Sequence, residues 1–228
     1  GGKWAPLGKV EDLQQRDLIR TGSGGTTRLS FDDGSVVVLS SSSLLRLDEM
    51  GKKDGRPRVL LRLLGGQVRA TVSKAYGTGE GRFEIETPTA VASVRGTEFI
   101  VTYDTVSADS EVICIEGSVE VLGVLGVLGR PVVLEPGMGT TVRKGAFPAA
   151  PAPVPADKIG AMRKLEEGAV SYEDSLIATF TGADSEAVLN PPQGVARQAA
   201  AEGRRQSLRT RAKVVSKDAE IIDQSIQE

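Results

Sequence analysis

The chain has 228 residues, 39% of them hydrophobic and 25% charged, which is the ordinary composition of a globular protein that buries a core. Its formal net charge of −2 argues against binding to nucleic acid or anionic lipid through a global field. The sequence contains no histidine, which excludes histidine-based triads, metal sites and pH switches. We therefore expect no enzyme, no cofactor and no metal site.

The N-terminal residues carry no recognisable targeting signal. The sequence opens with Gly1-Gly2-Lys3, and no apolar stretch reaches the 18 or so residues that a membrane helix needs. We expect no membrane span in this chain, with any export leader or anchor removed or lying outside it.

Short β-branched runs separated by glycine dominate residues 13–143 and predict an all-β domain over residues 1–145. The expected fold is a compact antiparallel β-sandwich or an irregular, coiled β-sheet. Four apolar runs, each interrupted by a glycine-bearing turn, predict hairpins over residues 29–39, 60–72, 112–122 and 132–142. The corresponding turn glycines are Gly34, Gly66, Gly117 and Gly137.

The apolar pattern changes register at Gly96. Apolar residues occupy even positions over residues 90–94 and odd positions over residues 99–103. Because side chains alternate along a strand, such a shift needs one extra residue, so we predict a β-bulge at Gly96. The bulge would bring Arg95 and Glu98 to the same side of the strand, where they could form an ion pair that fixes register. The alternative is that Arg95 is a surface residue with Glu98 elsewhere.

This segment, Val94-Arg95-Gly96-Thr97-Glu98-Phe99, closely resembles the signature of the FecR domain family. Four other segments resemble the family in the same order: Asp17 to Gly22, Leu29 to Ser35, Gly66 to Arg69, and Glu116 to Val121. The resemblance covers roughly residues 13–143. It implies a non-catalytic, all-β envelope domain, best known as the periplasmic part of regulators that relay receptor occupancy to a sigma factor.

Two features toward the end of the β region bear on function. Cys114 lies in an apolar run that predicts a buried strand, where a lone thiol behaves as a small hydrophobe. Residues 121–129 repeat Val-Leu-Gly three times, and Leu122, Leu125 and Leu128 are candidate partner contacts. The alternative for this repeat is a strand end and a loop laid over the core.

The C-terminal third differs in composition from the β region. Residues 146–156 contain four prolines and predict an extended linker. Residues 157–228 predict an α-helical tail with a break at 190–194. Leu208, Val215 and Ile222 recur at heptad spacing and are further candidate partner contacts.

Two function classes remain after these exclusions. The first is a periplasmic protein–protein interaction module, either in envelope signalling or as a structural subunit of an envelope assembly that uses its helical tail to dock. Its partners would be other envelope proteins. The second is a glycan- or peptidoglycan-binding β-sandwich, which the low aromatic content of 4% makes less suitable.

Overall fold

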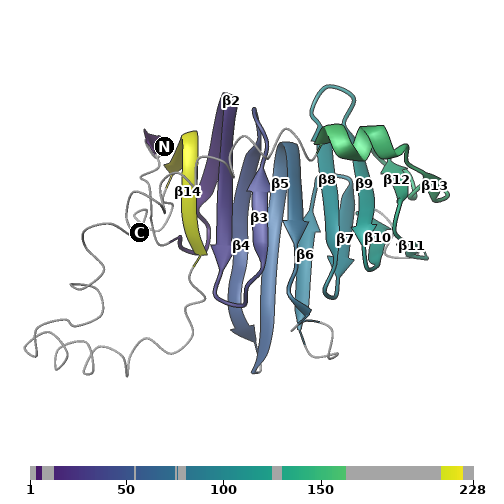
Figure 1. Ribbon diagram of the computed structural model, residues 1–228, viewed down its shortest axis with the longest axis horizontal. Coiled ribbons are helices and arrows are strands. Elements are labelled where there is room, and N and C mark those ends of the chain that lie inside the picture. Colours follow the sequence, from purple (N-terminus) through teal and green to yellow (C-terminus); the bar gives the residue numbers. More distant parts are fainter. Residues whose placement is uncertain are drawn as a thin grey trace, which may run out of the picture.

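The computed structural model describes residues 4–6, 13–53, 55–74, 76, 81–124, 130–162 and 212–222. Its strands form a two-layered, coiled β-sheet that is elongated along the stacking direction of the strands (Figure 1). The strands are β1 (Ala5–Pro6), β2 (Leu18–Phe31), β3 (Val36–Leu39), β4 (Leu44–Lys53), β5 (Arg56–Thr71), β6 (Arg82–Glu86), β7 (Ala90–Val94), β8 (Glu98–Asp104), β9 (Asp109–Glu116), β10 (Val119–Gly123), β11 (Val132–Leu134), β12 (Met138–Val142), β13 (Ala152–Pro153) and β14 (Ala212–Ile222).

Two long strands pass through both layers. The first part of β5 pairs with β4 and β6, whereas its last residues, from Gly66 on, pair with β3 and β8. In the same way β2 pairs with β4 at its start and with β3 near its end. The first layer continues from β6 through β7, β10 and β11, and the second from β8 through β9, β12 and β13.

Apolar side chains from both layers fill the space between them. Buried and outward residues alternate along β6, β7 and β10, as the period of two in a half-buried strand requires. Phe83 of β6 packs edge-on against Phe31 of β2 at 6.1 Å and against Tyr76 at 5.8 Å between ring centroids. These contacts join the layers and close the core near the middle of the sheet.

The sequence correctly predicted a mainly β fold, but the strand connections differ from the prediction. Only the first predicted hairpin forms, with β2 and β3 joined through Asp33 and Gly34. Strands β9 and β10 pair with other strands rather than with each other, and so do β11 and β12. Gly117 and Gly137 therefore lie at corners where the chain changes layer. The sheet is also not wholly antiparallel, because β5 and β6 run parallel.

Gly66 lies inside a strand rather than in a hairpin turn. Its φ is +85°, and the pairing of β5 with β4 gains an extra residue just before it, where Leu44 faces Gly65 and Leu45 faces Leu63. A Cβ on Gly66 would lie 2.6 Å from the Cα of Ser43 and 2.8 Å from the carbonyl oxygen of Ser42. The glycine allows β5 to bend across the layers against this neighbouring backbone.

The segment predicted as a linker pairs with the β-sheet. Within it, β13 pairs with β12, and the amide of Ala149 donates to the carbonyl of Thr141 at 2.9 Å. A short helix over residues 156–162 follows, and its Lys158 forms an ion pair with Glu111 of β9 at 2.6 Å. Residues 146–156 thus lie along the edge of the second layer instead of leading away from it.

The helix predicted at the C-terminal end is wrong for residues 212–222, which form β14. This strand pairs antiparallel with β2 from Phe31 to Leu18, and β1 pairs with its far end. Val215 and Ile222, predicted on one helical seam, are consequently strand residues. The predicted helix over residues 163–211, its break at 190–194 and Leu208 lie outside the described residues.

We predict that Gly66→Ala lowers the free energy of unfolding by about 3–5 kcal/mol, because the methyl group combines left-handed backbone strain with a clash against Ser42 and Ser43. Gly137→Ala is the matched control, since its φ is +80° but nothing lies within 4 Å of the added carbon. It should lose only about 1–2 kcal/mol. Urea unfolding of both variants measures the difference, and equal losses would contradict the close approach at Gly66.

Candidate functional site

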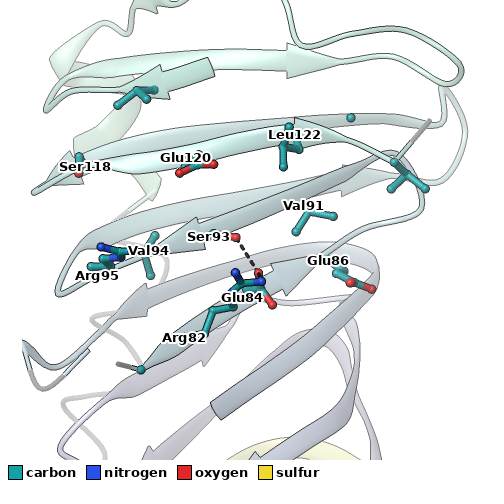
Figure 2. A pocket seen from close by; sticks show the side chains of 14 residues that line it. Arg82, Glu84, Glu86, Val91, Ser93, Val94, Arg95, Ser118, Glu120 and Leu122 are labelled. Carbon is teal, nitrogen blue, oxygen red and sulfur yellow. Dashed lines mark hydrogen bonds and ion pairs between the residues drawn. The ribbon is translucent and has the colours of Figure 1, made fainter. Parts of the chain in front are cut away.

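An open groove of about 710 Å³ lies on the outer face of the first layer (Figure 2). Its floor is made by the outward side chains of β6, β7, β10 and β11. The strand register arranges these side chains in rows that cross the strands: Glu84 lies opposite Ser93, Ser93 opposite Glu120, and Glu120 opposite Val133. The next row contains Glu86, Val91 and Leu122.

The polar side chains of the groove differ in how far they are neutralised. Glu84 accepts a hydrogen bond from the hydroxyl of Ser93 at 2.9 Å and lies 3.4 Å from Arg82. Glu86 pairs with Arg62 of β5 at 2.7 Å, and Arg62 also reaches Asp48 at 3.2 Å. Arg95 and Glu120 are both exposed, and neither has an ion-pair partner among the residues that the structure describes.

An apolar part of the groove adjoins these charges. Val91 and Leu122 lie opposite each other, and Val133 and Val124 are 57% and 46% exposed. Figure 2 shows Arg95 and Ser118 toward one end of the groove and Leu122 and Val91 toward the other. Within the described residues, the groove thus offers an unpaired cation, an unpaired carboxylate and an apolar surface on one face of the sheet.

Leu122 is the one predicted Val-Leu-Gly contact residue that the structure describes, and it lines this groove. Leu125 and Leu128 lie outside the described residues. Val91, Ser93, Glu120 and Val133 also line the groove, and the sequence pattern did not predict them as contact residues. Their alternation with buried neighbours was visible in the sequence, but which strands lie side by side was not.

Residues 95–97 form a corner between the layers rather than a bulge within one strand. β7 ends at Val94 in the first layer, and β8 begins at Glu98 in the second. Gly96 has a φ of +72°, and a Cβ there would lie 3.0 Å from the Cα of Lys74. The change of register noted at Gly96 is therefore real, but its cause is a change of layer.

Thr97 joins this corner to the next one. Its buried hydroxyl donates to the carbonyl of Ser118 at 2.9 Å, and its own carbonyl accepts from the amide of Val72 at 2.9 Å. A Cβ on Gly117 would lie 2.9 Å from that hydroxyl, so the two corners pack too closely for a side chain at residue 117. The motif thus builds the stacked corners along one side of the sheet.

Glu98 forms its ion pair with Arg69 of β5, and the predicted pairing with Arg95 is wrong. The closest contact, between Arg69 Nη2 and Glu98 Oε1, is 2.5 Å, and the two side chains are only 23% and 13% exposed. The strands that carry them are neighbours, with Arg69 facing Ile100. Because residues 95–97 turn the chain through a corner, Arg95 points to the outer face while Glu98 lies on the second layer.

Cys114 is buried against the corner at Gly117, and burial raises the pKa of its thiol to about 11. The thiolate, which is the reactive species, is then scarce near neutral pH. Among the described residues, no group of three or more cysteine or acidic side chains is arranged to hold a metal ion.

The profile of the FecR protein family matches residues 17–120. Two crystal structures of a proposed anti-sigma factor from Parabacteroides distasonis ATCC 8503 have similar folds, each with a TM-score of 0.52, at 21% and 19% sequence identity. The matches cover 64% and 67% of this chain and 63% of each of those chains. No curated protein sequence gives a significant match.

We predict that Glu98→Gln lowers the free energy of unfolding by about 1–3 kcal/mol, because it leaves the half-buried guanidinium of Arg69 without its carboxylate. Arg95→Ala should change stability by less than about 0.5 kcal/mol, since that side chain is exposed. If chemical unfolding showed that both variants lose the same free energy of unfolding, the result would support a pairing of Glu98 with Arg95 and contradict its pairing with Arg69.

We also expect the native protein to react with a thiol reagent at pH 8 on the order of a hundredfold more slowly than the unfolded chain, because so little of Cys114 is thiolate. Because the pKa of Cys114 is raised, the thiolate fraction of the folded protein grows as the pH approaches 11, and the labelling rate should increase with it. Release of coloured thiolate from a disulfide reagent, with and without urea, measures it. Fast labelling of the folded protein would contradict the burial of Cys114.

Residues 17–120 of this chain match the FecR protein family, and the corner motif at residues 94–99 lies within that match.

Proposed function

We propose that this chain is a non-catalytic regulator of cell-envelope signalling, located in the periplasm, whose FecR domain acts by binding another protein through the groove on β6, β7, β10 and β11. The FecR family match and the similarity to proposed anti-sigma factors support the signalling role. In the part of the chain that the structure describes, no helix combines the length and apolar character needed to cross a bilayer.

The observation that carries the proposal is the unneutralised charge in the groove. Glu84 and Glu86 each have a cation beside them, whereas neither Arg95 nor Glu120 has an oppositely charged partner among the described residues. Exposed charges beside exposed valines are suited to a protein partner, because complementary charges set orientation while apolar contacts contribute affinity.

The occupant that fits is an extended protein segment. It would present an acidic side chain to Arg95, a basic side chain to Glu120 and apolar side chains to Val91 and Leu122. A sugar is less suitable, since no aromatic ring lines the groove within the described residues. Sugar-binding sites commonly rely on such rings as apolar platforms.

We predict that deleting the gene in its natural host changes a defined set of transcripts, and that Glu120→Arg reproduces that change because it reverses the unpaired charge in the groove. Glu135→Arg is the control, because Glu135 is also an exposed carboxylate but lies outside the groove, in the turn before β12. RNA sequencing of strains matched for protein abundance measures the effect.

Two results would count against the proposal, and they are distinguishable. An unchanged transcript profile in the deletion strain would contradict a signalling role. A changed profile in the deletion strain together with a normal one in the Glu120→Arg strain would keep the signalling role and reject the groove.

A further inference from the structure

At one end of the sheet, the edge of β2 is covered by β14, a strand from the far end of the chain. β14 pairs with β2 over ten residue pairs, from Ala212 with Phe31 to Ile222 with Leu18. Figure 1 shows β14 beside β2 at one end of the sheet, whereas residues 156–162 lie toward the opposite end. Residues 163–211 lie between these two elements in the sequence, and β14 lies outside the matched FecR domain.

Three side chains, Trp4, Arg20 and Glu220, join the C-terminal part of β14 to the body of the sheet, and we call them the latch. The guanidinium of Arg20 on β2 forms an ion pair with Glu220 of β14, and its Cζ lies 4.1 Å from the centroid of the Trp4 ring. The register places Arg20 directly opposite Glu220. Ala219, next to Glu220, is buried against the core. The edge of β2 is thus a binding site for one strand, with a charge that specifies its register.

Without β14, the edge of β2 would expose a long row of unpaired backbone groups, which is a template for another strand. The occupant with a demonstrated fit is β14 itself, and β14 of a second copy brings the same backbone pattern and the same Glu220. A stretch as long as residues 163–211 spans more than about 150 Å when extended, so the covalent connection permits a strand to reach a neighbouring molecule.

We propose that the edge of β2 is a strand-exchange site, at which two copies of this chain associate by each binding the other's β14. The exchange is symmetric, so it closes as a dimer in which the edge of β2 is filled on both copies. Because each strand is tethered to its own β2, the monomer is favoured at low protein concentration, and association grows where copies are concentrated. The proposal does not depend on the groove or on the signalling role.

Charge reversal at the latch tests the exchange in the full-length protein. Arg20→Glu and Glu220→Arg each place like charges opposite one another within a single chain. When the two variants are unfolded and refolded together, only exchanged strands restore two matched pairs. The double variant Arg20→Glu/Glu220→Arg is the control, because it restores the pair within each chain.

We expect native mass spectrometry to show a one-to-one heterodimer in the mixture, at least tenfold more abundant than dimers of either variant alone or of the double variant. A mixture that remains monomeric would overturn the proposal. So would equal dimer formation in the double variant, since association would then be independent of the latch.

A second measurement applies if either charge variant fails to fold. Ser30 lies opposite Lys213 in a regular part of the pairing, at a separation that suits a disulfide. Isotope-labelled Ser30→Cys chains, refolded with unlabelled Lys213→Cys chains under mild oxidation, should yield a linked peptide joining the two chains. Absence of that peptide, when a single chain carrying both substitutions forms the disulfide internally, would overturn the proposal.

Discussion

The structure depends on corners at which the chain leaves one layer of the sheet and enters the other. At Gly96 and Gly117 the backbone has positive φ and packs closely against neighbouring residues. A Cβ on Gly96 would lie 3.0 Å from the Cα of Lys74, and a Cβ on Gly117 would lie 2.9 Å from the hydroxyl of Thr97 and 3.1 Å from the carbonyl oxygen of Gly96. The hydroxyl of Thr97 then bonds the main chain of the next corner. Because these contacts join consecutive crossings, they fix which strands become neighbours, and hence which side chains share a face.

The groove is a consequence of these crossings. β7 and β10 become neighbours in the first layer only because the corners at residues 95–97 and 117–118 send β8 and β9 into the second. Arg95 and Glu98 are close in sequence, but the corner gives them different roles, one exposed in the groove and the other paired with Arg69. The motif that builds the corner thus also shapes the groove, to which it contributes Val94 and Arg95.

The sequence predicted strand content well and strand neighbours poorly. Alternation identified the inward faces of residues 90–94 and 99–103, and all four predicted turn glycines have positive φ. Yet glycine between two apolar runs is compatible with a hairpin, a corner or a bend, and Gly34, Gly117 and Gly66 are examples of the three. Local sequence cannot separate these, because the difference lies in which distant strand accepts each edge.

The C-terminal strand shows the same limit. The heptad spacing of Val215 and Ile222 suggested a helix, but the edge of β2 offers ten backbone pairs and a charged partner for Glu220, and this tertiary context decides the conformation. Glu120 and Val133 could not be predicted as groove residues for a related reason, since only pairing across the strands brings Glu120 beside Ser93 and Val133.

Inter-strand nuclear Overhauser effects test the layer-changing corners most directly. The account predicts contacts from the backbone of Val119 to Val94 and to Leu134, and contacts from Val112 to Val101 and to Thr140. Contacts between the strands that carry Val112 and Val119, as a hairpin around Gly117 would produce, would contradict it.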